Sequence, residues 1–215
     1  MKSAYKLLIL DYGGVYSFDY TLGNFNKIML SSFGKAPIDT EKKEISKHSR
    51  LLAANEITVK NYIERVGAIL GVSQLPSAKQ FEKATVAMTN PPSEEMIELV
   101  EKVRQTGIKV SLLSDMYMFE VKLTKPWGRY EGFDYTSFSA EAGMSKADPR
   151  FFQQTLTHFG VPAKDALFVD DTLEHTVVAK SVGLATLFID KKKYTGVELL
   201  VRDIEELLAI KETRP

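Results

Sequence analysis

Near its N-terminus the chain contains the stretch Leu7-Leu8-Ile9-Leu10-Asp11-Tyr12-Gly13-Gly14-Val15-Tyr16. Four consecutive apolar residues, followed by an acid and two glycines, are typical of a fully buried strand that ends in a tight turn. In an open α/β sheet, ligands bind at the carboxyl ends of such strands. The stretch therefore predicts that Asp11 lies at the edge of a sheet where a site can form.

The composition limits the classes of protein that remain possible. A length of 215 residues allows one large domain, or one domain with a sizeable insert. The 28 basic and 28 acidic residues balance, so there is no bulk electrostatic argument for binding nucleic acid or an anionic membrane. Because cysteine is absent, disulfide scaffolds, thiolate metal sites and cysteine nucleophiles are excluded.

Apolar runs in the sequence are too short for a signal peptide or a membrane span. We therefore expect a cytoplasmic protein with neither a nucleic-acid nor a membrane partner. The sequence leaves open whether the protein is a monomer or a homodimer.

Residues 22–90 show helical periodicity and no convincing strand. One apolar stripe consists of Phe25, Ile28, Met29 and Phe33, and a second of Tyr62, Ile63, Val66, Ile69 and Leu70. Thr58 and Gly71 are suitable end residues for the second helix, and residues 77–88 repeat the pattern more weakly. Because Asn90-Pro91-Pro92-Ser93 interrupts the helical run, we expect a helical domain over 18–90, inserted into a core of 1–17 and 91–215.

Helices and strands alternate after the interruption, which indicates βαβ units and a parallel sheet. Strands are expected at 108–113, 135–138, 166–169 and 185–189, and residues 116–134 are expected to be irregular, with a loop at 125–128. Helices are expected from Ser93 to Gly107, from Asp148-Pro149 to Gly160, up to Gly183, and around 199–210. The fold class is therefore α/β.

Four groups of polar residues fall at strand ends or just before a helix: Asp11, Ser114 with Asp115, Lys146, and the pair Asp170-Asp171. Three carboxylates that converge in a low dielectric repel one another and require a cation. Oxygen ligands without His or Cys favour a hard ion, namely Mg²⁺. A lysine and a serine hydroxyl beside them suit a phosphoryl group, with one carboxylate free to attack phosphorus.

The order and spacing of these groups resemble the haloacid dehalogenase-like hydrolase superfamily over nearly the whole chain. Four motifs carry the resemblance: Asp11-Tyr12-Gly13-Gly14-Val15, Ser114 after an apolar strand, Gly143-Met144-Ser145-Lys146-Ala147-Asp148-Pro149, and Phe168-Val169-Asp170-Asp171-Thr172-Leu173-Glu174-His175. The resemblance implies a Rossmann-like core with helices on both faces of the sheet and a helical cap at 18–90. It also implies a phosphatase of the capped small-molecule type, similar to those acting on sugar 1-phosphates and to the phosphatase half of epoxide hydrolases.

The resemblance further implies the roles of individual residues. Asp11 would be the nucleophile that forms an aspartyl-phosphate, while Ser114 and Lys146 would hold the phosphoryl oxygens of a small phosphorylated metabolite. The expected phosphate-binding set is Gly13, Gly14, Ser114, Asp115 and Lys146, and the expected Mg²⁺ ligands are Asp11, the carbonyl of Gly13, Asp170 and Asp171.

Two positions depart from the family pattern. Most family phosphatases have a second Asp, the general acid, where this chain has Gly13. Its absence removes a proton donor worth typically about 10²–10⁴ in rate, which favours anomeric or acyl phosphates as substrates, or a proton from Tyr16, the cap or the substrate. His175 occupies a position where Asn or Asp is common, and is expected either to orient Asp171 or to lie on the surface.

Other readings remain open from the sequence. Ser114, Lys146 and the Asp pair can also be explained as a helix cap, a solvated charge and caps of the following helix. Dehalogenases on this fold also lack the second Asp, but they usually carry serines in the fourth motif. Phosphonate hydrolysis requires a cap lysine, for which the candidates are Lys27, Lys35, Lys42, Lys43, Lys47 and Lys60. A non-catalytic protein on a phosphatase fold is the alternative from a different class.

Overall fold

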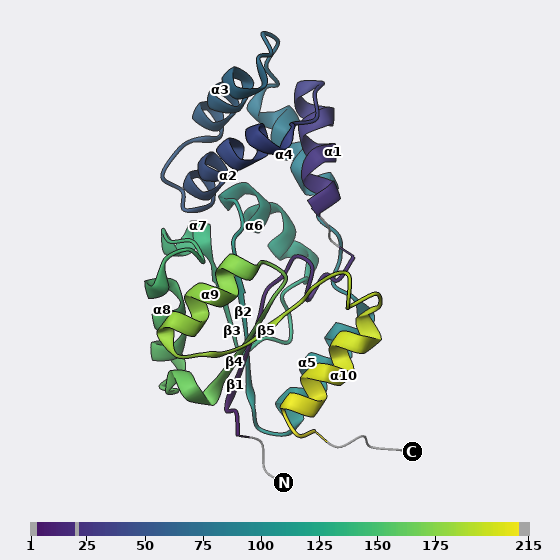
Figure 1. Cartoon of the computed structure of the whole chain (residues 1–215), viewed down its shortest axis with the longest axis vertical. Helices are drawn as coiled ribbons and strands as arrows, with labels where there is room; N and C mark the ends of the chain where they lie inside the picture. The colour runs from purple at the N-terminus through teal and green to yellow at the C-terminus, as the bar shows by residue number, and fades with distance from the viewer. Residues whose placement is uncertain (1–3, 20–21, 211–215) are drawn as a thin grey trace.

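The computed structural model describes residues 4–19 and 22–210 (Figure 1). The strands are β1 (Leu7–Leu10), β2 (Lys109–Ser114), β3 (Tyr135–Phe138), β4 (Ala166–Asp170) and β5 (Ala185–Phe188). The helices are α1 (Leu22–Phe33), α2 (Asp39–Ala53), α3 (Val59–Leu70), α4 (Ala78–Ala87), α5 (Glu94–Gln105), α6 (Met118–Thr124), α7 (Ser139–Ala142), α8 (Pro149–Phe159), α9 (Leu173–Val182) and α10 (Val197–Leu207). Short 3₁₀ turns are formed by Lys125–Trp127 and Ala163–Asp165.

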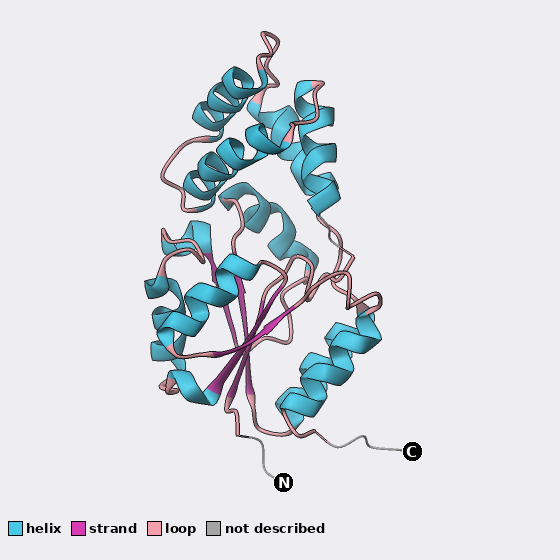
Figure 2. Cartoon of the chain, in the orientation of Figure 1, coloured by secondary structure: helices cyan, strands magenta, loops and turns pink. Residues whose placement is uncertain are grey.

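The strands form one parallel sheet in the order β3-β2-β1-β4-β5. The central strand β1 pairs on one side with β2 and on the other with β4, so that Leu10 lies opposite both Leu112 and Val169. The carboxyl ends of all the strands consequently meet at one edge. Figure 2 shows that this edge faces the helices α1–α4.

The side chains of β1 alternate between two apolar layers, as expected for a strand buried on both faces. Leu8 and Leu10 pack in a cluster that includes residues of α5 and α10, whereas Leu7 and Ile9 pack against α8 and α9. Figure 1 shows the two helix pairs on opposite sides of the sheet. The α/β class with helices on both faces, predicted from the sequence, is confirmed.

Helices α1–α4 have an apolar cluster of their own. Its buried members include both predicted stripes, except that Phe25 and Ile69 are only partly buried against it. Tyr117 and Phe119, at the start of α6, also pack against this cluster. The separate cluster supports the predicted division into a core of 1–17 and 91–215 and an insert at 18–90, which remains a proposal.

The expectation of irregular structure over 116–134 is wrong at its beginning, because α6 occupies Met118–Thr124 and a 3₁₀ turn follows it. Glu120 is the third residue of this helix and accepts a hydrogen bond from the backbone N–H of Tyr117 at 3.0 Å, which is one half of a capping box. Seven residues are too few to display a helical period. The helix therefore depends on its cap and on packing against α4, which a sequence pattern does not reveal.

Capping residues were predicted with mixed success. Thr58 accepts a hydrogen bond from the N–H of Asn61, and Asp148 accepts one from the N–H of Arg150. Ser93 precedes α5 as expected, but its hydroxyl accepts a hydrogen bond from the N–H of Phe18 instead of capping the helix. The last helix begins and ends earlier than predicted, at Val197–Leu207.

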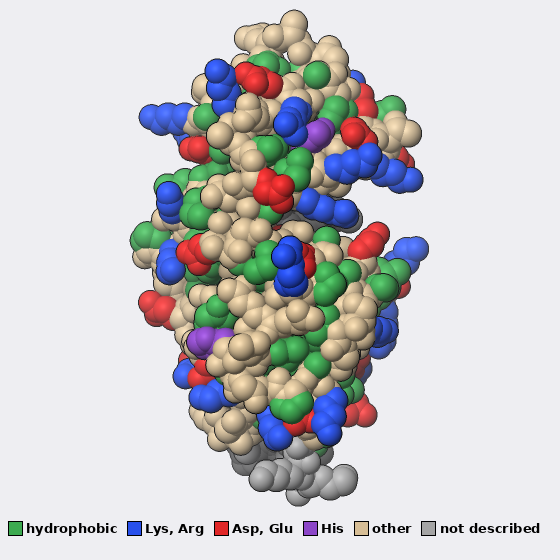
Figure 3. Space-filling model, turned by 90° about the vertical axis from the view of Figure 1, so that its left-hand side faces the viewer, with side chains coloured by type: hydrophobic (Ala, Val, Ile, Leu, Met, Phe, Trp, Pro, Cys, Tyr) green, Lys and Arg blue, Asp and Glu red, His purple; other side chains and the backbone are tan. Residues whose placement is uncertain are grey.

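Helices long and apolar enough to span a membrane do not occur in the described ranges. On the face shown in Figure 3, basic and acidic side chains alternate over both the upper helices and the core. The balance of charge in the composition is thus also a balance on this surface.

Candidate active site

Asp11 directly follows β1 and lies with its carboxylate among hydrogen-bond donors. Its oxygen Oδ1 accepts hydrogen bonds from the N–H of Tyr12 at 2.7 Å and from the hydroxyl of Ser114 at 3.0 Å. The same oxygen lies 2.8 Å from Nζ of Lys146. Within the part of the chain that is described, no donor reaches Oδ2, which leaves that oxygen available for other contacts.

Lys146 joins two carboxylates across the site. Its Nζ lies 2.8 Å from Oδ1 of Asp11 and 2.7 Å from Oδ2 of Asp170, and the residue is 1% exposed. Burial alone lowers the pKa of a lysine, but Asp11 and Asp170 raise the pKa of Lys146 above its ordinary value. The lysine is therefore a fixed positive charge between two acids.

Three carboxylates converge where the sequence predicted a metal. Ligand oxygens of Asp11, Asp170 and Asp171 all lie within 4.8 Å of one another. Burial raises the pKa of Asp11 to about 7 and that of Asp171 to about 6, and the charge of Asp170 raises both. Asp170 behaves differently: although burial acts to raise its pKa, Lys146 and His175 lower it to about 2.

The differences in pKa indicate which of the three carboxylates lack a compensating positive charge. Asp170 has its charge balanced by Lys146, whereas Asp171 has no ion pair within 4 Å among the described residues. A hard divalent cation bound by Asp11 and Asp171 would relieve the repulsion that raises their pKa values. The carboxylate set therefore fits Mg²⁺.

Gly14 makes room for one of these acids. A Cβ atom at Gly14 would lie 2.1 Å from Oδ2 of Asp171, and its φ of +75° is in the left-handed region that favours glycine. The glycine turn after β1 thus allows the backbone and the Asp171 carboxylate to approach closely.

Asp115 positions the lysine through the backbone. Its Oδ1 accepts a hydrogen bond from the N–H of Lys146 at 2.9 Å. The strand β2 thereby supplies two contacts to the site, the hydroxyl of Ser114 to Asp11 and the carboxylate of Asp115 to the Lys146 backbone. The two residues were predicted to bind phosphate, and in this structure they contact Asp11 and Lys146.

His175 contacts a different carboxylate from the one expected. Its Nδ1 lies 3.2 Å from Oδ2 of Asp170, and its Nε2 lies 3.8 Å from Oδ2 of Asp115. The side chain is 16% exposed, so it is not an ordinary surface residue. His175 therefore supports the two acids that hold Lys146.

Tyr16 does not have the environment of a replacement proton donor. It is 2% exposed, its ring lies edge-on to Phe133 at 4.8 Å between centroids, and it belongs to the core cluster. Burial raises its pKa to about 12, so that the phenol is a weak acid.

The sequence interpretation overlooked Lys191. Its Nζ donates hydrogen bonds to the carbonyls of Gly14 at 2.6 Å and Phe18 at 3.0 Å, and it lies 3.8 Å from the centre of the Phe18 ring. The signal that could have found it is its place three residues after β5, at the same edge of the sheet as the other strand ends. Lys191 therefore stabilises the loop that follows Asp11 through hydrogen bonds to two of its carbonyls.

A family model for haloacid dehalogenase-like hydrolases matches residues 26–183. The match includes Ser114, Lys146 and the Asp170-Asp171 pair, and it begins after Asp11. Among solved structures, a HAD family enzyme from Bacteroides thetaiotaomicron in complex with magnesium and inorganic phosphate has a TM-score of 0.65 and 23% identity, covering 86% of this chain and 94% of that one. At this identity the likeness is one of fold.

Two curated proteins are similar in sequence. A sesquiterpene phosphatase, astK, from Aspergillus oryzae is 24% identical over 200 residues, which are 93% of this chain and 97% of that protein. Acyl-CoA dehydrogenase family member 10 from Mus musculus is 25% identical over 170 residues, which are 74% of this chain, and the chain spans only 15% of that protein's length. With the family model covering most of the sequence, the chain belongs to the haloacid dehalogenase-like hydrolase family.

Proposed function

We propose that the protein is a Mg²⁺-dependent phosphatase of small phosphorylated metabolites, with Asp11 as its nucleophile. The observation that carries the proposal is the asymmetry of the Asp11 carboxylate. Its Oδ1 contacts Tyr12, Ser114 and Lys146, whereas no donor from the described residues reaches Oδ2. A carboxylate fixed through one oxygen presents the other to an electrophile in a defined direction. The sesquiterpene phosphatase that covers nearly the same length supports this chemistry.

The reaction has two steps. In the first, Oδ2 of Asp11 forms a bond to phosphorus while the bond between phosphorus and the leaving oxygen breaks. In the second, water attacks the phosphorus of the aspartyl-phosphate, which releases inorganic phosphate and restores the carboxylate. Ser114 and Lys146, which now contact Asp11, would donate to the phosphoryl oxygens and stabilise their charge.

Mg²⁺, held by Asp11, Asp171 and the carbonyl of Gly13 with Asp170 beside them, would supply charge neutralisation for the phosphoryl group. Lys146 keeps Asp170 in its ionised form and fixes its position. Lys191 and Gly14 fix the loop that carries the Gly13 carbonyl.

Gly13 sets the preference among substrates. With no carboxylate at this position and with Tyr16 buried in the core, the usual general acid for the leaving oxygen is missing. Leaving groups that need no proton, such as the carboxylate of an acyl phosphate, or that need little, such as an anomeric oxygen, are therefore favoured. The natural substrate is expected to come from these classes.

The proposal is tested by comparing acetyl phosphate with a simple alkyl phosphate in the presence and absence of Mg²⁺. We expect phosphate release that requires Mg²⁺ and a kcat/KM at least about a hundredfold higher for acetyl phosphate, because the missing general acid is worth about that much or more. Equal rates for the two substrates would contradict the leaving-group preference. Absence of release from both would contradict the phosphatase assignment.

Phosphonate hydrolysis has less support from the structure. A lysine that forms a Schiff base needs a desolvated site, but the candidate cap lysines are exposed or only partly buried. Four of them, Lys35, Lys42, Lys47 and Lys60, lie within ion-pair distance of carboxylates of the inserted helices. The acidic pair Asp170-Asp171, in turn, disfavours a metal-free dehalogenase.

A further inference from the structure

The segment that returns from the inserted helices to the core is tied to the site at one carbonyl. The carbonyl oxygen of Asn90 accepts hydrogen bonds from the hydroxyl of Tyr12 at 2.8 Å and from the hydroxyl of Ser17 at 3.3 Å. Nη1 of Arg129 donates to the same oxygen at 3.3 Å and to the carbonyl of Thr89 at 2.9 Å. Three donors, two from the loop after β1 and one from the segment after α6, thus converge on the returning segment.

Tyr12 connects this carbonyl directly to the proposed nucleophile. Its backbone N–H donates to Oδ1 of Asp11 at 2.7 Å, and its side chain reaches Asn90. The residue is 3% exposed, and its ring lies edge-on to those of Tyr16 and Tyr130, with centroids 6.1 and 5.6 Å away. Because the ring is closely packed, a displacement of the Tyr12 hydroxyl is expected to shift the Tyr12 backbone N–H as well.

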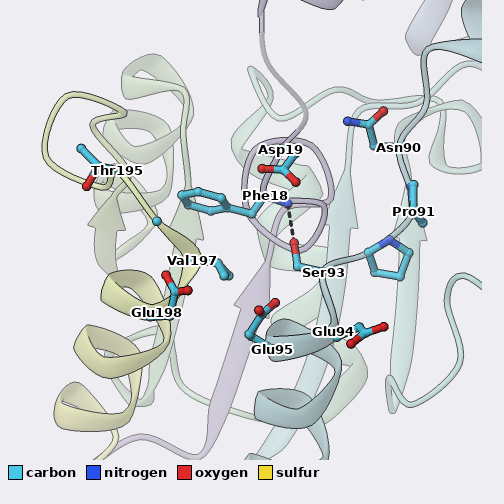
Figure 4. A pocket seen from close by; sticks show the side chains of 12 residues that line it. Phe18, Asp19, Asn90, Pro91, Ser93, Glu94, Glu95, Thr195, Val197 and Glu198 are labelled. Atoms are coloured by element: carbon cyan, nitrogen blue, oxygen red, sulfur yellow. Dashed lines mark hydrogen bonds between the residues drawn. The ribbon is translucent and has the colours of Figure 1, made fainter.

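The two linkers that join the core to the inserted helices, residues 16–19 and 89–93, are hydrogen-bonded to each other and line a cavity. The N–H of Ser93 donates to the carbonyl of Tyr16 at 3.0 Å, and the N–H of Phe18 donates to the hydroxyl of Ser93 at 3.1 Å. Figure 4 shows the second bond among the side chains that line a cavity. The cavity has a volume of about 470 Å³ and is lined by residues 18–19, 90–95 and 195–198. The returning linker therefore borders open space.

Movement of this linker would widen access to the site. Asp11, Ser114 and Lys146 are only 6%, 3% and 1% exposed in this structure. The chain passes between core and inserted helices at these two linkers. A change in the position of the returning linker would therefore change the position of the inserted helices relative to the site.

We propose that Tyr12 is a positioning residue that couples the closed position of the returning linker to the orientation of Asp11. The bond from its hydroxyl to Asn90 forms when the linker is in place, and the same residue then holds Oδ1 of Asp11 for attack. This inference rests on the proposed phosphatase function. It adds that the returning linker reaches its closed position and the Asp11 carboxylate becomes oriented for attack at the same time.

The test uses Tyr12→Phe, which keeps the ring and the backbone N–H and removes the hydroxyl, with its bond to Asn90 and its interaction with Arg129. With 4-nitrophenyl phosphate and Mg²⁺, we expect kcat to fall about fivefold to tenfold, the equivalent of one hydrogen bond. KM should change less than about twofold, because the phosphoryl group is still held by Ser114 and Lys146. Amide hydrogen exchange of residues 89–93 should become faster by a similar factor.

Two further variants separate this role from general loosening. Tyr130→Phe removes another buried phenol, one that bonds Thr124 and not the linker, and we expect it to keep kcat within about twofold of the wild type. Ser17→Ala removes a second donor to Asn90 that has no contact with Asp11. It should speed exchange in residues 89–93 but lower kcat less than Tyr12→Phe does.

Several results would overturn the coupling. These are an unchanged kcat in Tyr12→Phe, a loss of equal size in Tyr130→Phe, or a rise in KM with kcat unchanged. If wild-type protein releases no phosphate, the proposed function fails, and hydrogen exchange still tests the linker by itself. Wild-type exchange rates at residues 89–93 in Tyr12→Phe would then show that the hydroxyl does not hold the linker. If Tyr12→Phe does not fold, faster exchange in Ser17→Ala without any loss of kcat would contradict the coupling.

Discussion

Two lysines at similar distances from acids illustrate the difference between the sheet edge and the inserted helices. Nζ of Lys47 lies 2.6 Å from Glu44 on α2, and both side chains are largely exposed, at 66% and 48%. Nζ of Lys146 lies 2.7 Å from Asp170, with exposures of 2% and 0%. Water screens the first pair, so it contributes little to stability, whereas the second has replaced its hydration entirely with protein contacts.

The same contrast holds for the two regions as a whole. Three ion pairs of α2 and α3 each join neighbouring turns of one helix. The charges at the sheet edge, in contrast, come from β4, from the residues after β1 and β2, and from the loop before α8. Charges that a fold brings together and buries cost desolvation free energy, and such groups cluster at functional sites. Burial, not distance, therefore distinguishes the candidate site from the surface pairs.

The largest expected effect comes from removing the nucleophile. Asp11→Asn keeps the size and the burial of the side chain but removes its charge, and we expect phosphatase kcat to fall by at least about a thousandfold. The matched change on the inserted helices is Glu44→Gln, which should leave kcat unchanged. Steady-state assays with acetyl phosphate measure both variants. A comparable loss in Glu44→Gln, or retained activity in Asp11→Asn, would break the comparison.

Removing the buried cation should have the next largest effect. Lys146→Met leaves Asp11 and Asp170 buried without the cation that they share, and we expect the free energy of unfolding of the metal-free protein to fall by about 3–5 kcal/mol. Lys47→Met should shift the urea midpoint far less, since its partner is solvated. If the two midpoints move equally, burial does not separate the two regions.

Glycine substitutions test the close approach at the metal site. Gly14→Ala places a Cβ 2.1 Å from Oδ2 of Asp171, whereas Gly34→Ala, at the end of α1 with a similar φ of +70°, meets nothing within 4 Å. Both variants should lose about 1–2 kcal/mol of stability from backbone strain. Only Gly14→Ala should weaken Mg²⁺ binding in isothermal titration calorimetry, by at least about tenfold. Equal affinities would place the metal away from Asp171.

The last expected effect is one of pH. The pKa values of Asp11 and Asp171 are raised to about 7 and about 6, so in the metal-free protein these groups add stability that is present near pH 4 and lost as the pH rises through 6 and 7. The unfolding free energy should therefore fall between pH 5 and pH 8, and Mg²⁺ should stabilise the protein more at pH 8. The gradient should become smaller in the double variant Asp11→Asn with Asp171→Asn, where Glu120, whose pKa burial raises to about 7, still contributes. Urea titrations at several pH values measure it, and a rise in stability over this interval would contradict the assigned shifts.

The sequence predicted the sheet edge better than it predicted the connections around it. Asp11, Ser114, Lys146 and Asp171 were identified because each follows an apolar strand or precedes a strong helix start, both of which are local patterns. Helix α6 was missed because its seven residues are held by packing against α4 and not by periodicity. The bond from Lys191 to Gly14 spans 177 positions, and no local pattern indicates a contact of that separation.

His175 and Tyr12 illustrate a second reason. The sequence placed His175 near the fourth motif but could not tell which of the two adjacent acids it contacts, since neighbouring residues of a strand end point in different directions. Tyr12 was visible only as the residue between an acid and a glycine. Its contact with Asn90 depends on where the inserted helices return to the core.

The most direct test of the account is to identify the phosphorylated residue during turnover. Wild-type protein with Mg²⁺ is mixed with acetyl phosphate, quenched with acid after a fraction of a turnover, digested and analysed by peptide mass spectrometry. We expect one phosphoryl group on Asp11, absent when the label is chased before quenching and absent without Mg²⁺. Turnover with no phosphoryl group on Asp11, or with the group on another residue, would contradict the assignment of Asp11 as the nucleophile.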